Sequence, residues 1–119
     1  MAKVLLIDDE IHVRSLMKYL IHWEELGLTL EGEYDNAQGA VAKMQQEPAD
    51  IVITDICMPG MDGLEMIEQI QQSNQNCRFI LISGYRDFEY AKKAIGLGVS
   101  EYIVKPINEE EINKTLRKV

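Results

Sequence analysis

Residues 4–9 of this chain read VLLIDD, a short apolar run that ends on two aspartates. Three later runs have the same character: residues 51–55 read IVITD, residues 78–83 read RFILIS, and residues 101–105 read EYIVK. Continuous apolar runs of this length are typical of parallel strands that are buried on both faces. We therefore predict buried strands at Lys3–Ile7 and Ile51–Thr54, and further strands at Arg78–Ser83 and Glu101–Val104.

A different pattern lies between the first two of these strands. Residues 28–34 read LTLEGEY, and polar residues alternate there with Leu28, Leu30, Gly32 and Tyr34. A period of two indicates a strand with one buried face and one exposed face. We therefore predict a fifth strand, half exposed, at an edge of the sheet.

Helical periodicity fills the intervals between the strands. The apolar stripes predict helices from Ile11 to about Leu26, then after Asn36, after Gly63, after Asp87 and after Asn108. The fourth of these helices has Phe88, Ala91 and Ile95 as its apolar stripe. Asn36, Asp87 and Asn108 are expected to cap their helices, because their side chains can accept hydrogen bonds from the first turn.

Five strand–helix units with short loops predict a parallel sheet with helices on both faces, because such crossovers are right-handed. The fold class is α/β: a flavodoxin-like, doubly wound (βα)5 three-layer sandwich with strand order 2-1-3-4-5. In that order the half-exposed strand lies at an edge, as its alternation requires. We expect residues 1–119 to form one domain, a common length for a domain.

Composition excludes several functional classes. The net charge of −8 opposes binding to DNA or RNA, whose phosphates must be neutralised by cations. No apolar run approaches the roughly 20 residues that span a bilayer, and no secretory signal precedes the first strand. We therefore expect a cytoplasmic protein, without membrane contact, that is complete at its amino end. Cys57 and Cys77 are expected to be free thiols, and His12 and His22, ten residues apart on one predicted helix, do not suit a shared metal.

The predicted strand order gathers charged residues at the carboxyl ends of the strands. Asp8 and Asp9 become neighbours of Asp55, with Ser83 and Lys105 on its other side. Two carboxylates ~4 Å apart repel by about 4 kcal/mol at an effective dielectric constant near 20. Lys105 offsets part of this repulsion, and hard oxygen ligands favour magnesium or manganese for the rest. Asp55 is then a candidate nucleophile for a phosphoryl group, which Ser83 and Lys105 could contact.

The motifs Asp8-Asp9, Asp55 with Met58-Pro59-Gly60 and Gly63, Ser83-Gly84, and Lys105-Pro106 span nearly the whole chain. In this order and spacing they resemble the receiver domains of bacterial two-component response regulators. Residues 83–91, SGYRDFEYA, resemble in particular the receivers that are joined to AraC-type DNA-binding domains.

The resemblance implies a role for each site residue. Asp55 would accept a phosphoryl group from a phosphohistidine on a sensor histidine kinase. Asp9, Asp55 and the backbone carbonyl of Cys57 would ligate Mg²⁺, with Asp8 acting through water. Ser83 and Lys105 would contact the phosphoryl group, the Lys105–Pro106 peptide bond would be cis, and Tyr102 would be the aromatic residue that moves with Ser83.

The resemblance also implies partners. The fourth helix, the fifth strand and the fifth helix would form a face that changes on phosphorylation, often to make a homodimer. The domain would catalyse only its own phosphorylation and slow dephosphorylation, so it would not be an enzyme in the usual sense. It would form the amino-terminal part of a longer regulator, and a separate effector domain would bind DNA and control transcription.

Other functions remain open at this point. A Mg²⁺-dependent phosphohydrolase with an aspartate nucleophile usually has a second acid two residues after the nucleophile, where this chain has Cys57. A flavin or nucleotide module needs a phosphate-binding loop after the first strand, where Asp8-Asp9-Glu10 has the wrong charge. A receiver-like interaction module that is never phosphorylated would be expected to have lost site residues that this chain retains.

Overall fold

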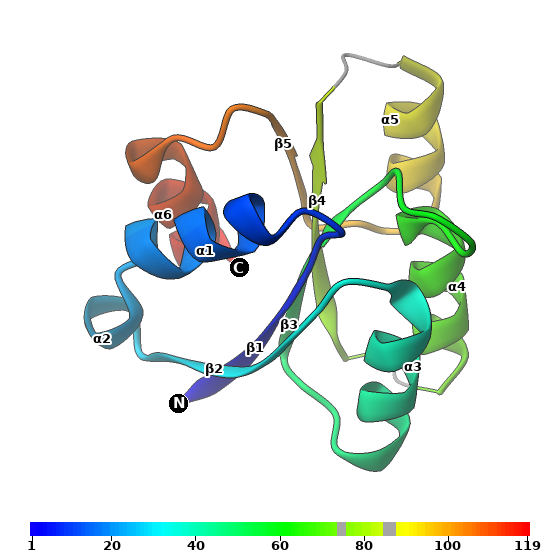
Figure 1. The fold of residues 1–119 in the computed structure, drawn as a ribbon, viewed down its shortest axis with the longest axis horizontal. Helices are drawn as coiled ribbons and strands as arrows, with labels where there is room; N and C mark the ends of the chain where they lie inside the picture. The colour runs from blue at the N-terminus through cyan, green and yellow to red at the C-terminus, as the bar shows by residue number, and fades with distance from the viewer. Residues whose placement is uncertain (74–75, 85–87) are drawn as a thin grey trace.

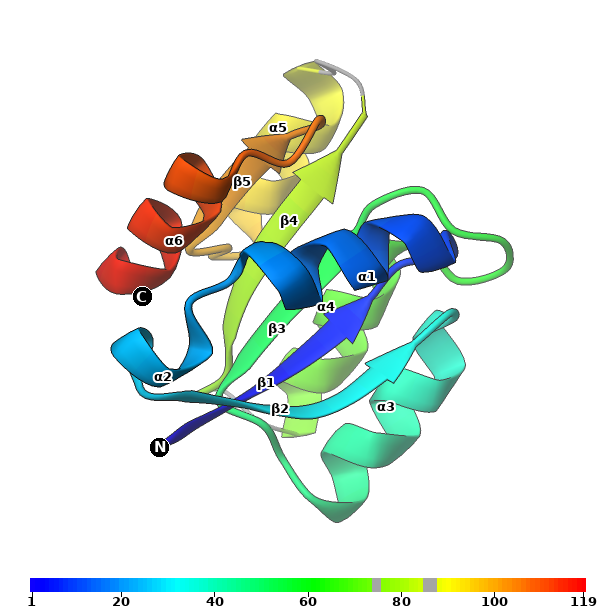
Figure 2. The same cartoon turned by 60° about the vertical axis from the view of Figure 1, so that its left-hand side comes forward.

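The computed structural model describes residues 1–73, 76–84 and 88–119, and shows the predicted parallel sheet. Its order is β2-β1-β3-β4-β5, which confirms the predicted fold class. The strands are β1 (Ala2–Ile7), β2 (Leu28–Tyr34), β3 (Ile51–Asp55), β4 (Arg78–Ser83) and β5 (Glu101–Val104). Figure 2 shows β1 and β3 in the interior of the sheet and β2 at its edge.

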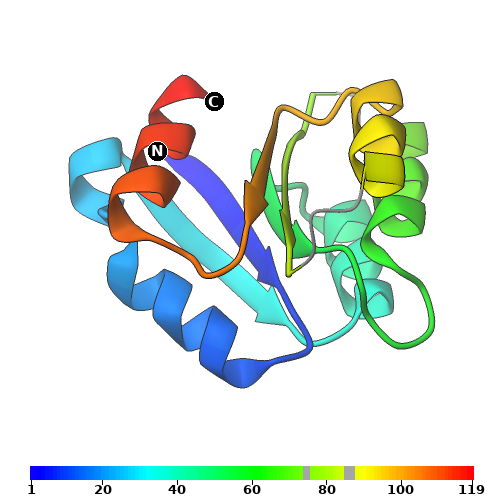
Figure 3. The same cartoon turned by 90° about the horizontal axis from the view of Figure 1, so that it is seen from above.

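Helices cover both faces of the sheet (Figures 1 and 3). They are α1 (Ile11–Leu20), α2 (Trp23–Leu26), α3 (Ala37–Gln46), α4 (Gly63–Ser73), α5 (Phe88–Gly96) and α6 (Glu109–Lys118). α1, α2 and α6 lie on one face, and α3, α4 and α5 lie on the other. Each face has its own buried apolar cluster: Leu5 and Phe79 belong to the cluster under α3 and α4, and Leu6 and Ile80 to the cluster under α1 and α6.

The first helix ends earlier than the prediction of Ile11 to about Leu26. Ile21 has extended backbone angles, and the short α2 begins only at Trp23. The Asn113 side chain of α6 accepts a hydrogen bond from the His22 backbone N–H (2.8 Å) and donates one to the Leu20 carbonyl (2.9 Å). These bonds satisfy backbone groups that the break in the helix exposes. His12 and His22 therefore do not share a helix, and that prediction was wrong.

The edge strand β2 contains a bulge that the alternating sequence did not reveal. Val4 of β1 pairs with Leu30, but the next residue, Leu5, pairs with Gly32, so Glu31 has no counterpart. An extra residue reverses the faces of all residues after it. Leu30 thus packs on the α1 and α6 side, whereas Tyr34 packs on the α3 and α4 side.

Two side chains of the predicted helix stripes, Leu16 and Ile95, are exposed instead of buried. Ile95 was expected to face the core, but it is 77% exposed, and its neighbour Ala94 is buried instead. One residue turns the helix by about 100°, so Ala94 occupies the inward face. The cap at Asp87 and the side chains of Phe88 and Ala91 lie outside what the structure describes.

Two of the predicted helix caps, Asn36 and Asn108, are confirmed. The Asn36 and Asn108 side chains accept hydrogen bonds from the backbone N–H groups of Gly39 and Glu111, as expected of caps. Cys57 is exposed, Cys77 is buried, and the two residues form no disulfide bond. Across the described part of the chain, every helix is too short or too polar to cross a bilayer.

Candidate functional site

Three aspartates meet at the carboxyl ends of β1 and β3. Asp8 and Asp9 directly follow β1, and Asp55 is the last residue of β3, which pairs with β1. One carboxylate oxygen from each of the three residues lies within 4.8 Å of the other two. Asp8 is buried and Asp55 is 6% exposed, whereas Asp9 is open to solvent. The predicted acidic cluster is therefore present, with its open side at Asp9.

Lys105 brings a positive charge to this cluster from the end of β5. Its Nζ lies 3.3 Å from Asp8 Oδ2 and 3.5 Å from Asp55 Oδ2. The Lys105 backbone N–H donates to the Ser83 carbonyl (2.7 Å), so the end of β4 fixes the backbone position of Lys105. The Lys105–Pro106 peptide bond is cis, as predicted.

Burial and the neighbouring charges shift the pKa values of the groups in the cluster. Burial, and then the neighbouring Asp8 carboxylate, raise the pKa of Asp55 to about 6, although Lys105 opposes this shift. Burial also raises the pKa of Asp8. For Lys105, burial favours the neutral amine, but Asp55 and Asp8 outweigh it and raise the pKa. One ammonium thus offsets only part of the repulsion among three acids, and the site favours a further cation.

The donor atoms of the cluster fit a hard divalent cation. Asp8 Oδ1 accepts a hydrogen bond from the Glu10 backbone N–H (2.9 Å), whereas the buried Asp8 Oδ2 has its ion pair with Lys105 Nζ (3.3 Å) but no hydrogen bond of good geometry to a described residue. Carboxylate and carbonyl oxygens are the ligands that Mg²⁺ and Mn²⁺ prefer. Asp8, Asp9 and Asp55 could supply such ligands, and the backbone carbonyl of Cys57 remains a predicted one.

A close backbone approach fixes the position of Asp55. Gly63, the first residue of α4, donates its N–H to the Ile56 carbonyl (2.8 Å). A β-carbon at Gly63 would lie 2.3 Å from the Asp55 carbonyl oxygen, so this position has room only for glycine. The predicted motif included Gly63, but its contact with the backbone of Asp55 appears only in the structure.

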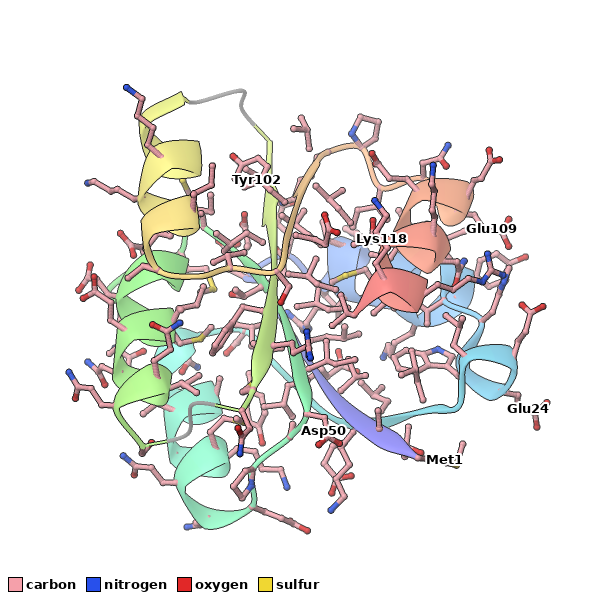
Figure 4. The ribbon with its side chains drawn as sticks, turned by 180° about the vertical axis from the view of Figure 1, so that it is seen from behind. Met1, Glu24, Asp50, Tyr102, Glu109 and Lys118 are labelled. Atoms are coloured by element: carbon pink, nitrogen blue, oxygen red, sulfur yellow. The ribbon has the colours of Figure 1, made fainter. Side chains whose placement is uncertain are left out.

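The other two predicted site residues lie on the neighbouring strands. Ser83 is the last residue of β4 and is buried. Tyr102 pairs with Leu81 across β4 and β5, and it packs partly against the apolar cluster under α3 and α4. Figure 4 shows Tyr102 on the α5 side of the sheet. Both residues are placed as predicted, and their roles remain predictions.

Sequence reasoning missed two residues beside the cluster, Arg14 and Glu33. Arg14 Nη1 donates to the backbone carbonyl of Asp8 (2.6 Å), and Arg14 Nε donates to Glu33 Oε1 (2.9 Å). The position of Arg14 in the helix that follows Asp8-Asp9 gave a weak signal for this contact. Glu33 gave none, because the bulge in β2 decides which face it occupies.

Comparisons with known proteins agree on one family. The family model of the response regulator receiver domain matches residues 4–117 of this chain. The uncharacterized transcriptional regulatory protein YesN of Bacillus subtilis is 43% identical over 119 residues, all of this chain and 32% of YesN. The transcriptional regulatory protein HptR of Staphylococcus aureus is 31% identical over 119 residues, all of this chain and 46% of HptR. The chain therefore spans a third to a half of these relatives.

Solved structures show the same fold. The REC domain of AraT, a response regulator from Geobacillus stearothermophilus, is 32% identical and superimposes with a TM-score of 0.92. That comparison covers 98% of this chain and 91% of the AraT domain chain.

Proposed function

This chain belongs to the response regulator receiver domain family, and we propose on that basis that it is a phosphorylation-dependent switch with Asp55 as its phosphoryl acceptor. The observation that carries this proposal is the placement of Asp55, which is buried beside both the Asp8 carboxylate and the Lys105 ammonium. A carboxylate so placed is a suitable nucleophile, because a neighbouring cation can stabilise the charge of an incoming phosphoryl group.

In the proposed reaction an Asp55 carboxylate oxygen attacks the phosphorus of a phosphohistidine on a sensor histidine kinase. The new O–P bond replaces the P–N bond, and the electron pair of that bond stays on the histidine nitrogen, which takes a proton from solvent. The Lys105 ammonium contacts one phosphoryl oxygen as a fixed positive charge, and the Ser83 hydroxyl donates a hydrogen bond to another phosphoryl oxygen.

Mg²⁺, held by Asp9, Asp55 and the Cys57 backbone carbonyl, with Asp8 contributing through water, would neutralise phosphoryl charge. Among the described residues the three clustered carboxylates share one ammonium, that of Lys105, which supports a further cation here. Mn²⁺ has similar ligand preferences and would substitute. The domain acts only on itself, so turnover of free phosphate esters is not part of its function.

The output of the switch would be a change in the face made by α5, β5 and α6. Ser83 moves toward the phosphoryl group, and Tyr102 turns inward behind it. The exposed Ile95 of α5 adjoins Val99 and Tyr102 in a shallow hollow on this face, which supports a homodimer contact. Transcription control, in the cytoplasm, would belong to a separate DNA-binding effector domain, because the net charge of −8 disfavours DNA contact here.

Mass spectrometry after incubation with Mg²⁺ and acetyl phosphate tests the acceptor directly. We expect one acid-labile phosphoryl adduct on wild type and on the Asp35→Asn control, an exposed acid that is not one of the three clustered aspartates, and none on Asp55→Asn. An undiminished adduct on Asp55→Asn, or no adduct on wild type, would contradict the proposal.

A further inference from the structure

The backbone of Asp8 is held on both sides where it enters the acidic cluster. Its N–H donates to the Tyr34 carbonyl of β2 (3.1 Å), which continues the pairing of the sheet by one residue. Its carbonyl accepts a hydrogen bond from Arg14 Nη1 (2.6 Å). The chain direction at Asp8-Asp9 is therefore fixed by the sheet on one side and by α1 on the other.

Arg14 is itself held in place by the edge strand. Its Nε donates to Glu33 Oε1 (2.9 Å), and Lys18 donates to the other oxygen of the same carboxylate. The Arg14 side chain is only 12% exposed, so its orientation is restricted by packing as well. Hydrogen bonds from Lys18 and then Arg14 lower the pKa of Glu33, which keeps this carboxylate charged at neutral pH. The β2 bulge at Glu31 is what turns Glu33 toward α1.

The bonding of Arg14 indicates a geometric role. A cation close to a metal site should weaken binding of Mg²⁺ by Coulomb repulsion. Arg14, however, directs its recorded hydrogen bonds to a backbone carbonyl and to Glu33, which offsets its charge. Groups that orient ligands from outside the coordination shell commonly determine how tightly a metal is bound.

We propose that Arg14, braced by Glu33, is a positioning residue that holds the Asp8-Asp9 segment so that both carboxylates face Asp55, where Asp9 would bind Mg²⁺ directly and Asp8 through water. This inference rests on the proposed Mg²⁺-dependent function. Glu33 and the β2 bulge thereby connect the edge of the sheet to the metal affinity of the site.

The test is calorimetric titration of Mg²⁺ into wild type, Arg14→Ala, Arg14→Lys and the control Lys18→Ala. Lys18 bonds the same Glu33 carboxylate but makes no hydrogen bond to Asp8, so its loss weakens the brace at Glu33 alone and should raise the Kd less than the loss of Arg14 does. We expect Arg14→Ala to raise the Kd about tenfold, as typical for residues that orient metal ligands. Removal of a nearby positive charge alone would lower the Kd, so the sign of the change separates positioning from electrostatics.

Two outcomes would overturn the inference: an Arg14→Ala protein that binds Mg²⁺ as tightly as wild type or more tightly, or a wild type that binds no Mg²⁺. If circular dichroism shows that Arg14→Ala does not fold, the Mg²⁺ titration of Arg14→Lys decides instead, and its Kd should again exceed that of wild type. A lysine has no planar guanidinium group with which to bond both Glu33 and the Asp8 carbonyl. Saturating Mg²⁺ should restore phosphorylation by acetyl phosphate in the Arg14 variants. The titration needs no phosphodonor, so a wild type that binds Mg²⁺ but accepts no phosphoryl group refutes the proposed function alone.

Discussion

Gly63 lies so close to Asp55 that a β-carbon on it would be 2.3 Å from the Asp55 carbonyl oxygen and 3.1 Å from the Cα of Ile56. Both neighbours are backbone atoms, and Asp55 ends a strand that is hydrogen-bonded on both sides. The contact therefore cannot be relieved by a side-chain rotation. It links the start of α4 rigidly to the candidate phosphoryl acceptor.

We predict that Gly63→Ala destabilises the protein by about 1–3 kcal/mol, the usual cost of forcing extra atoms into a packed site. It should also slow phosphorylation by acetyl phosphate, because relief of the clash displaces the Asp55 backbone. Urea unfolding and phosphorylation rates measure the two effects. Gly96→Ala is the matched control, since a β-carbon there meets no atom of the described residues within 4 Å. Equal stability of the Gly63 and Gly96 variants would contradict the prediction.

Asp55→Asn should stabilise the metal-free protein near neutral pH. The Asp55 pKa is about 6 in the folded state against 3.8 for an unperturbed aspartate, so the folded protein binds this proton more tightly. The free-energy cost of the charged Asp55 carboxylate in the folded state is fully present above pH 6 and absent below pH 3.8. The free energy of unfolding of wild type therefore falls as pH rises from 3.8 to 6. We expect the Asp55→Asn variant to gain about 1–3 kcal/mol at pH ~7.5.

Urea unfolding in EDTA at two pH values measures this effect. The advantage of Asp55→Asn should shrink steadily as pH is lowered from 6 toward 3.8. Saturating Mg²⁺ should reverse it at neutral pH, because the ion binds the folded wild type more tightly than the variant. A variant advantage that is constant with pH would show that the Asp55 charge is not its cause.

The sequence was sufficient to predict the sheet order and the acidic cluster, because apolar runs such as residues 51–54 mark strands whose carboxyl ends must converge. It was insufficient where a distant partner decides local structure. The break after Leu20 depends on Asn113, which lies 93 positions later. The contacts of Glu33 depend on a bulge, and strict alternation in the sequence of β2 conceals that extra residue.

His22 should contribute to stability in a pH-dependent manner. Its Nε2 lies 2.9 Å from Glu109 Oε2 and its Nδ1 lies 3.1 Å from Glu25 Oε2. The Glu109 carboxylate, and then Glu25, raise the pKa of His22 above 6.5. The charged imidazolium therefore favours the folded state fully below pH 6.5, and this contribution is lost as pH rises through the folded pKa.

Thermal unfolding of wild type and His22→Gln at several pH values tests the pH-dependent contribution of His22 to stability. We expect the variant to unfold at a lower temperature than wild type in mildly acidic buffer, and the difference to narrow in alkaline buffer. His12→Gln is the control, because His12 is exposed on α1 and has no ion pair with any described residue. A difference that widens with increasing pH would refute the assigned sign.

Asn113 should be important for stability despite being a polar residue in the core. It is 2% exposed, and its amide group bonds the His22 N–H, the Leu20 carbonyl and the Glu109 carbonyl. Removing the Asn113 amide leaves these three backbone groups without a side-chain partner, and each unsatisfied buried group costs about 1–3 kcal/mol. Water that enters the site relieves part of this cost. We predict that Asn113→Ala lowers the free energy of unfolding by about 2–4 kcal/mol.

Asn113→Asp separates the two ends of this amide. Aspartate keeps the acceptor for the His22 N–H but loses both donors, and it places a buried charge beside two carbonyl oxygens. It should therefore be at least as destabilising as alanine at neutral pH and recover at acidic pH, where the carboxyl group is protonated. The exposed neighbour Lys114→Ala should unfold in urea like wild type. An Asn113→Ala protein as stable as the Lys114 variant would show that α6 does not hold the break between α1 and α2.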